Sequence, residues 1–381
     1  MVTVPYWRLS GFYWFYFATL GAILPYWTLY LQSRGFNAQT IGQIMAIIMA
    51  FKILAPNLWG WVADYTGQRI VLIRFSSLLA ALCFSGVLFV EGFWGMILVM
   101  SAFSFFWNAA LPQVEATTFA YLGRRSHRYT QIRVWGSVGF IIVSVSLGWF
   151  FAKHPVTWLP VVLIGLFICV WLTTLFIPHQ KTPSIRITHE SLRQVLRQPA
   201  VTALFVVCLF MQASHGVYYT FYTIYLEGHG YSRGIIGQLW AFGVIAEVLA
   251  FLVMHRLLKR FSLHNLLITS LGLASLRWLL IGYYPGLLTV LLFAQTLHAA
   301  SFGLFHAVAI QFIFQYFPGQ LQGRGQALYS SFSFGAGSAI GSLSSGYLWD
   351  TIGAQESYLL AALTCGIAAW ISWQWVKPNR V

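Results

Sequence analysis

Long apolar segments alternate with short polar loops along almost the whole chain. Most segments have about 20 residues or more, the length that an α-helix needs to cross the hydrocarbon core of a bilayer. The longest polar stretch, PHQKTPSIRITHESLRQVLRQP at 178–199, follows the sixth segment. The pattern predicts an all-α membrane protein of twelve transmembrane helices, with six-helix bundles at 1–177 and 200–381 joined by a linker at 178–199. The predicted spans are 9–31, 39–62, 71–90, 94–119, 131–152, 156–177, 200–226, 233–254, 264–284, 286–316, 325–349 and 357–376.

Composition supports this prediction. Hydrophobic residues make up 59% of the 381 residues and charged residues only 8%, whereas a soluble domain has roughly 25% charged residues. A soluble enzyme or a nucleic-acid-binding protein is therefore excluded. The four cysteines all lie inside apolar segments, so we expect small core residues and no disulfide framework or metal site. The first segment has no A-x-A-like exit, so we expect a first span and no cleavable signal peptide.

The basic residues give the orientation. With the N-terminus inside, sixteen of the 22 lysines and arginines fall in inner loops and three in outer loops. This bias predicts that both termini and the linker lie in the cytoplasm. The formal net charge of +14 is then mostly an insertion signal, and not a mark of nucleic-acid binding.

The two halves repeat each other. YWTLYLQSRGFNAQTIGQIMA at 26–46 aligns without a gap with FYTIYLEGHGYSRGIIGQLWA at 221–241, and eight of the 21 positions are identical. The matches include Gly35 with Gly230 and Gly42 with Gly237, at an offset of 195 residues. Such a parallel repeat of six spans is typical of secondary transporters that bind their substrate at the interface of the halves.

Five charged side chains fall within predicted spans, where a charge costs at least about 2.5–3.5 kcal/mol. Each therefore needs a partner, a wet cavity or a function. Lys52 and Glu247 occupy equivalent positions of the repeat in the middle of their spans. Burial favours a neutral carboxyl group, so Glu247 is a candidate proton carrier, while Lys52 could bind an anionic substrate. The five are Lys52, Glu115, Arg133, Glu247 and Arg277.

Glu115 and Arg133 lie at equal distances from the loop that joins spans 4 and 5. In an antiparallel helical hairpin they come to a similar depth, so the sequence predicts a buried pair. The carboxylate could accept substrate hydroxyls or a proton, and the guanidinium could bind a carboxylate or a pair of hydroxyls. The alternative is an ion pair that only fastens the two helices.

The loop after span 2 reads Gly60-Trp-Val-Ala-Asp64-Tyr-Thr-Gly67-Gln-Arg69. Gly60 would let a neighbouring helix approach closely, Gly67 would permit a tight turn, and Arg69 offers a countercharge to Asp64. The spacing resembles the signature loop of the major facilitator superfamily. The resemblance implies a gating role for these residues and a fold of two six-helix bundles.

Stretches in both halves of the chain resemble the lactose permease group. Asn108-Ala-Ala-Leu-Pro-Gln-Val-Glu115 is followed by Arg133-Val-Trp-Gly, and Leu-Arg277 and Thr-Leu-His298 match the second half. The resemblance implies that Glu115 and Arg133 bind substrate and that Arg277 and His298 belong to a proton-coupling network.

The chain departs from that group at two positions of span 10. Ser301 stands where the group has a glutamate, and Gln295 where it has a lysine. A nearer resemblance is to the phenylpropionate permease group, carried by Val134-Trp-Gly-Ser-Val, by His215 before Tyr218-Tyr219, and by Gly237-Gln-Leu-Trp leading to Ala246-Glu-Val. That resemblance covers residues 1–376 and implies uptake of an aromatic acid.

We therefore predict a transporter that imports a small organic solute together with protons by alternating access. An aromatic carboxylic acid is the first candidate, and a sugar or nucleoside the second. An exporter of the same fold, a membrane-embedded enzyme or a sensor are the alternatives. Predicted substrate-binding residues are Lys52, Asn108, Glu115, Arg133, His215 and Tyr219. Predicted proton-coupling residues are Glu115, Glu247, Arg277 and His298, and predicted gating residues are Gly60, Asp64, Gly67 and Arg69.

The setting follows from the same reasoning. The proton gradient is the energy source, and we expect no cofactor, no metal, no catalytic residue and no nucleic-acid partner. The expected location is the inner membrane of a bacterium, where the protein meets the lipid bilayer, protons and its solute. We expect it to function as a monomer.

Overall fold

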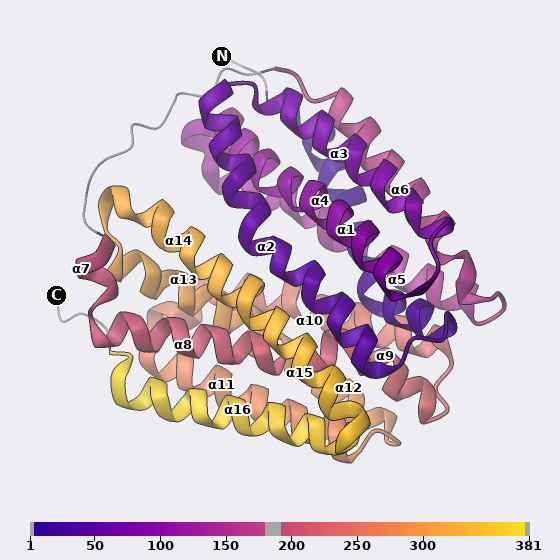
Figure 1. Cartoon of the computed structure of the whole chain (residues 1–381). Coiled ribbons are helices and arrows are strands. Elements are labelled where there is room, and N and C mark those ends of the chain that lie inside the picture. The colour runs from indigo at the N-terminus through magenta and orange to yellow at the C-terminus, as the bar shows by residue number, and fades with distance from the viewer. Residues whose placement is uncertain (1–3, 180–191, 378–381) are drawn as a thin grey trace. The chain divides into compact units, whose positions relative to one another are not determined.

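A computed structural model of the chain describes residues 4–179 and 192–377, and every regular element within these ranges is a helix (Figure 1). Residues 180–191 of the predicted linker lie outside the described ranges. Of the described helices, those before the linker are α1 (Tyr6–Ser33), α2 (Ala38–Thr66), α3 (Arg69–Ser85), η1 (Gly86–Leu88), α4 (Gly92–Leu122), η2 (Gly123–Arg128), α5 (Tyr129–Phe151), η3 (Val156–Trp158) and α6 (Leu159–Leu175).

The helices after the linker are more often interrupted. They are α7 (Leu192–Leu196), α8 (Pro199–Ser214), α9 (Gly216–Gly228), α10 (Arg233–Arg260), α11 (Leu263–Tyr283), α12 (Leu288–Thr296), η4 (Ala299–Leu304), α13 (Phe305–Tyr316), η5 (Gly319–Leu321), α14 (Gln322–Ser330), η6 (Ser331–Gly337), α15 (Ser338–Thr351) and α16 (Ala354–Trp375). Taken together, α8–α9, α12–α13 and α14–α15 each form one long, interrupted helix.

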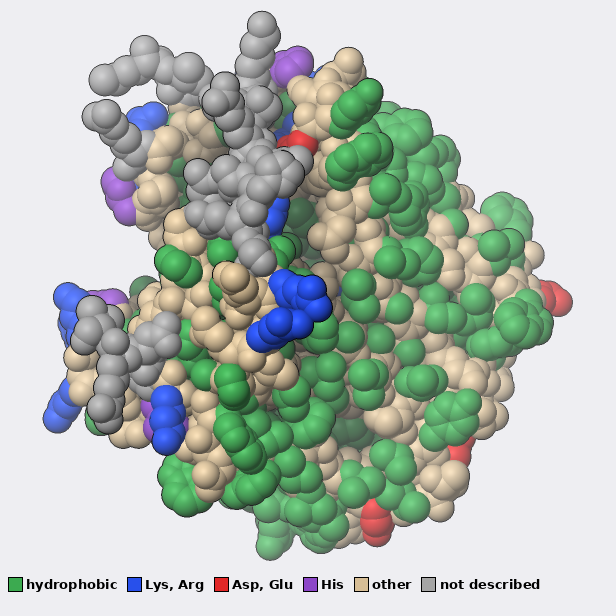
Figure 2. Space-filling view, turned by 60° about the vertical axis from the view of Figure 1, so that its left-hand side comes forward, with side chains coloured by type: hydrophobic (Ala, Val, Ile, Leu, Met, Phe, Trp, Pro, Cys, Tyr) green, Lys and Arg blue, Asp and Glu red, His purple; other side chains and the backbone are tan. Residues whose placement is uncertain are grey.

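The prediction of twelve long helices is confirmed. Nine helices of the described residues are long and apolar enough to cross a membrane by length and composition. The other three, α1, α14–α15 and α16, carry more aromatic, serine or glycine residues. Large apolar side chains are exposed on the outside of the helices, as a membrane protein requires, and Figure 2 shows them gathered over a broad face.

The contacts divide the chain into two compact units, each described by itself. Unit 1 comprises the described parts of 1–36, 51–186 and 232–238. In it α1 packs along α5 and α6, and α3 packs on α4 and α6. Gly139 sets the α1–α5 distance, because a Cβ there would lie 2.3 Å from the carbonyl oxygen of Trp14.

Unit 2 comprises the described parts of 37–50, 187–231 and 239–381. In it α16 packs on α8 and α11, and α9 packs on α15 (Figure 1). The predicted bundle boundaries at 177 and 200 stay a prediction.

Two of the close helix crossings, one in each unit, are related by the sequence repeat. A Cβ on Gly42 of α2 would lie 2.7 Å from the carbonyl oxygen of Ser342 in α15, within unit 2. A Cβ on Gly237 of α10 would lie 2.4 Å from the carbonyl oxygen of Ser144 in α5, within unit 1. The two serines begin the similar pentapeptides SLSSG and SVSLG. Small residues thus allow equivalent helices of the repeat, α2 with α15 and α10 with α5, to approach closely in the same way.

Three of the long helices are irregular within the membrane-length segments of unit 2. His215 separates α8 from α9, and η4 and η6 are π-helical turns. Such interruptions are frequent at functional sites and at binding sites of transporters. They are the first indication of where the site in this unit lies.

Candidate functional site

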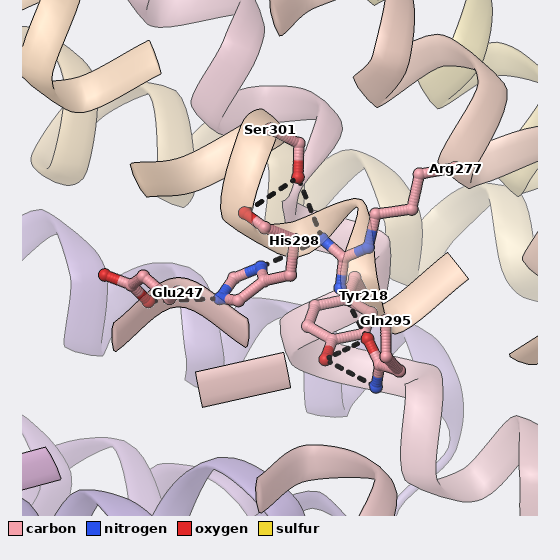
Figure 3. A network of polar contacts seen from close by, with 6 residues as sticks. All are labelled: Tyr218, Glu247, Arg277, Gln295, His298 and Ser301. Atoms are coloured by element: carbon pink, nitrogen blue, oxygen red, sulfur yellow. Dashed lines mark hydrogen bonds and ion pairs between the residues drawn. The ribbon is translucent and has the colours of Figure 1, made fainter. Parts of the chain in front are cut away.

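A buried arginine is the centre of a polar network in unit 2 (Figure 3). Arg277 of α11 has 0% of its surface exposed. Its Nη2 donates to Oε1 of Gln295 at 2.9 Å, and its Nη1 donates to Oγ of Ser301 at 3.3 Å and to Nδ1 of His298 at 3.1 Å. The guanidinium thereby binds Gln295 of α12, Ser301 of η4 and His298, which lies between these two elements.

Glu247 of α10 approaches the other side of the same imidazole. Its Oε2 lies 3.6 Å from Nε2 of His298. A guanidinium only donates hydrogen bonds, so Nδ1 of His298 must be the acceptor in its contact with Arg277. The neutral ring then carries its proton on Nε2, directed at the Glu247 carboxylate. His298 therefore connects the charges of Arg277 and Glu247 through one ring.

Tyrosines complete the network. Nε2 of Gln295 donates to the hydroxyl oxygens of Tyr218 and Tyr222, each at 3.1 Å. The Arg277 guanidinium also lies over the Tyr218 and Trp278 rings, 4.3 and 4.7 Å from their centroids. A cation enclosed by ring faces and carbonyl-type oxygens is stabilised without an ion pair of its own.

Space for Glu247 comes from a glycine. A Cβ on Gly303, in the π-helical turn η4, would lie 3.2 Å from Cγ of Glu247. Gly303 and η4 were not predicted as parts of the site. A glycine five residues after the polar His298 was the available signal in the sequence.

Two predicted substrate-binding residues, His215 and Tyr219, lie on the neighbouring helix of unit 2. His215 is the residue between α8 and α9, Tyr219 lies in the first turn of α9, and their rings stack at 5.7 Å with an interplanar angle of 28°. Phe302 of η4 lies 6.4 Å from His215 and 5.3 Å from His298, centroid to centroid. The aromatic side chains thus connect His215 with the Arg277 network.

In unit 1 the predicted pair of Glu115 and Arg133 is not formed, and this expectation is wrong. Oε1 of Glu115 accepts a hydrogen bond from Tyr129 at 3.0 Å. The Arg133 guanidinium lies over the Phe17 ring, 3.7 Å from its centroid. Each of the two side chains has an aromatic partner instead, Tyr129 at the start of α5 for Glu115 and Phe17 of α1 for Arg133.

Gly136 makes room for this arrangement. A Cβ there would lie 2.7 Å from the Phe17 ring and 2.9 Å from Nη1 of Arg133. Nearby, the Tyr16 and Trp107 rings are parallel at 4.1 Å. Unit 1 therefore presents one carboxylate and one guanidinium among aromatic faces.

The other two predicted binding residues of unit 1 behave differently from each other. Nδ2 of Asn108 donates to the carbonyl oxygen of Ser104 at 2.8 Å, so this amide is bound back to its own helix. Lys52 lies in the middle of α2 and is partly buried, and it forms no ion pair with another described residue.

The predicted gating loop has the expected turn and ion pair. Gly67 has φ +65°, and Nη2 of Arg69 donates to Oδ1 of Asp64 at 2.8 Å. The close helix approach expected at Gly60 is absent among the described residues, because a Cβ there would have only Nε2 of Gln113 nearby, at 3.8 Å. Gly60 is therefore not required for packing in this conformation.

Two surface grooves of about 510 and 250 Å³ lie along α1 and α5, and both include Trp135. None of the predicted site residues lines either groove. The four cysteines are free; Cys208 and Cys365 are buried as expected of small core residues, whereas Cys83 and Cys169 are only partly buried.

Comparison with known proteins agrees with this architecture. The family model described as "MFS_1 like family" matches residues 6–360. The "Probable 3-phenylpropionic acid transporter" of Escherichia coli (strain K12) is 28% identical over 93% of this chain and 94% of its own length. The maltose permease of Geobacillus stearothermophilus is 25% identical over 89% of this chain and 86% of its own length.

Among solved structures, a mutant of the nucleoside transporter NupG superposes with a TM-score of 0.87 at 18% identity, covering 97% of this chain and 99% of that one. A structure of NupG itself gives a TM-score of 0.82 at 19% identity, covering 98% of this chain and 99% of that one. These likenesses show the fold.

Proposed function

Because the chain belongs to the MFS_1 like family and is a secondary transporter of the major facilitator fold, we propose that it imports a small organic anion together with protons. The observation that carries this proposal is the connection from Glu247 through His298 to Arg277 in the middle of membrane-length helices. The Glu247 carboxylate of this cluster can take up a proton, and the electrostatic environment of Arg277 changes with the charge of Glu247.

The coupling follows from the charges. While Glu247 is ionised, its negative charge offsets that of Arg277 across the His298 ring. Protonation of Glu247 leaves the positive charge of Arg277 uncompensated in a medium of low dielectric constant. An arriving anion then gains more from binding, so proton and anion each favour the binding of the other.

His298 is less suited to carry the proton itself. A second proton on its ring would sit on Nδ1, facing Nη1 of Arg277 at 3.1 Å, where two donors would meet. We therefore assign the proton to Glu247 and an orienting role to His298. Arg277 also has a buried Nε with no hydrogen-bond partner among the described residues, a donor still available to an anion.

Lys52 and Arg133 are the proposed contacts to the carboxylate of the solute. Lys52 forms no ion pair with any described residue and sits at mid-helix, where an uncompensated ammonium is costly. Arg133 rests on Phe17 without an anionic partner at ion-pair distance in the described chain. Glu115, held by Tyr129, remains a candidate for substrate hydroxyls or a proton.

An aromatic carboxylic acid such as 3-phenylpropionate is the proposed solute. The 28% identical relative is named for that acid, and cations among aromatic rings suit a ring with a carboxylate. A sugar or nucleoside is the second candidate, because one sequence relative is a maltose permease and a nucleoside transporter has a similar fold. We place the protein in the bacterial inner membrane as a monomer, with both termini in the cytoplasm.

Uptake into proteoliposomes tests the proposal. Labelled 3-phenylpropionate is offered with and without a proton gradient, with lactose and uridine in parallel. An undissociated acid also crosses lipid and collects on the alkaline side, so protein-free liposomes set the baseline. Gradient-dependent uptake above that baseline supports the proposal. Uptake of lactose or uridine in its place contradicts the proposed solute, and no gradient dependence contradicts proton coupling.

A further inference from the structure

His215 has one ring nitrogen without a partner although the residue is fully buried. It lies between Ser214, the last residue of α8, and Gly216, the first of α9, with 0% of its surface exposed. Its Nδ1 lies 2.8 Å from the carbonyl oxygen of Met211, but its Nε2 makes no hydrogen bond within the described chain. A buried polar atom without a partner costs stability and therefore needs an explanation.

The backbone around His215 is held firmly. A Cβ on Gly216 would lie 2.1 Å from the carbonyl carbon of Gly341 in α15. A Cβ on Gly341 would lie 2.2 Å from the carbonyl oxygen of Ala213. The helix break therefore meets α15 backbone to backbone, and the backbone at His215 has little room to move.

The bond to Met211 determines what the ring offers. A carbonyl oxygen only accepts hydrogen bonds, so Nδ1 of His215 carries the proton. The neutral ring then presents a lone pair at Nε2. Oε1 of Gln212, almost one turn earlier and 2% exposed, is also without a partner. Two buried acceptors on one helix face require a donor to complement them.

Aromatic rings surround the imidazole of His215. The centroid of His215 lies 4.8 Å from Trp278, with the rings at 88°, and 5.7 Å from Tyr219 in a stacked arrangement. Phe302 of η4 lies 6.4 Å away. Ring faces beside a hydrogen-bond acceptor suit a flat ring that carries a donor at its edge.

We propose that Nε2 of His215, assisted by Oε1 of Gln212, accepts a hydrogen bond from a hydroxyl or N–H group on a ring of the transported solute. The inference rests on the proposed transport function and narrows its substrate class. A hydroxylated aromatic acid has this chemistry, and so does a sugar or a nucleoside. Unsubstituted phenylpropionate lacks it.

The test measures binding and transport separately. Binding is followed by the thermal stabilisation of the purified protein in detergent with four probes: 3-phenylpropionate, 3-(3-hydroxyphenyl)propionate, uridine and lactose. Competition in proteoliposomes then gives the half-saturating concentrations. We expect at least one donor-bearing probe to bind about five- to tenfold more tightly than 3-phenylpropionate, as one added neutral hydrogen bond implies.

Variants assign the preference to the histidine. His215→Phe keeps a ring against Trp278 and removes the acceptor, so the preference should disappear while 3-phenylpropionate binding persists. His215→Gln keeps an acceptor and should retain part of the preference. His229→Phe is the matched control, because Nδ1 of His229 has the same 2.8 Å contact to a carbonyl four residues earlier but lies at an exposed helix end.

Gln212→Met is the second variant if His215→Phe does not fold, and it should weaken the preference about threefold. A preference that survives in the variants that fold shows that neither side chain accepts the solute's hydrogen bond, and it overturns the inference. Equal binding of all probes by the unaltered protein, or no binding of any, overturns it too. Donor-selective binding without proton-driven transport leaves the inference standing and removes the proposed function.

Discussion

At the scale of single residues, the carboxyl group of Glu247 is the part of the network on which proton coupling depends. Glu247→Gln keeps the shape and a contact to His298 but carries no titratable group. We expect accumulation driven by a proton gradient to fall at least tenfold, while exchange of labelled for unlabelled solute continues. Counterflow in proteoliposomes measures the second quantity. Glu91→Gln, an exposed carboxylate, is the control, and equal accumulation by both variants would argue against Glu247 as the proton carrier.

Arg277 has a structural role that a lysine cannot fill. A lysine offers one point of charge and cannot reach Gln295, His298 and Ser301 together. Loss of two of these bonds should cost about 1–3 kcal/mol, since buried hydrogen bonds in membrane proteins average about 0.6 kcal/mol and reach about 1.7. A lower Tm of Arg277→Lys in detergent checks this, with Arg260→Lys as the control. An unchanged Tm would mean that the network adds no stability.

The sequence singled out three residues that come together in unit 2, but it did not give their contacts. Glu247, Arg277 and His298 stand out as polar residues inside apolar spans, and the structure brings them into one cluster. Glu115 and Arg133 stand out in the same way, but each contacts an aromatic side chain and they form no ion pair with each other. Whether two buried polar side chains touch depends on which neighbours fill the space, and hydrophobic periodicity carries no such information.

At the scale of elements, the two glycine crossings govern how closely the helices pack. A Cβ at Gly237 would lie 2.4 Å from the carbonyl oxygen of Ser144, so a larger side chain has to displace that backbone. Gly237→Val should therefore separate α10 from α5. We expect faster maleimide labelling of a cysteine placed at Ser144 and a Tm lower by several degrees. Gly165→Val is the matched control, because nothing lies within 4 Å of a Cβ there. Similar labelling in both variants would contradict the crossing.

The length of the spans was predictable, and their interruptions were not. Apolar length fixes where a helix can cross a bilayer, so the predicted spans agree with the helices within a few residues. The break at His215 follows from the contact of Gly216 with Gly341, which lies far away in sequence. The π-helical turns η4 and η6 likewise result from packing. Such features are decided by neighbouring helices, and a single segment does not reveal them.

At the scale of the whole molecule, the excess of inner-loop lysines and arginines predicts the topology. A fluorescent protein fused after Val381 should fold in the cytoplasm and fluoresce. A cysteine at Arg34, in a predicted outer loop, should react with a membrane-impermeant maleimide added to intact cells. Labelling of a cysteine at Lys259 under the same conditions, and none at Arg34, would reverse the orientation.

The central claim is that solute and protons move together through this protein. Its most direct test records the pH inside proteoliposomes with an enclosed dye when solute is added without any gradient. The account predicts acidification faster than in protein-free liposomes, in proportion to solute uptake, and reduced to the protein-free rate in Glu247→Gln. Solute uptake above the protein-free rate with no added acidification, or acidification unchanged in Glu247→Gln, would contradict the account.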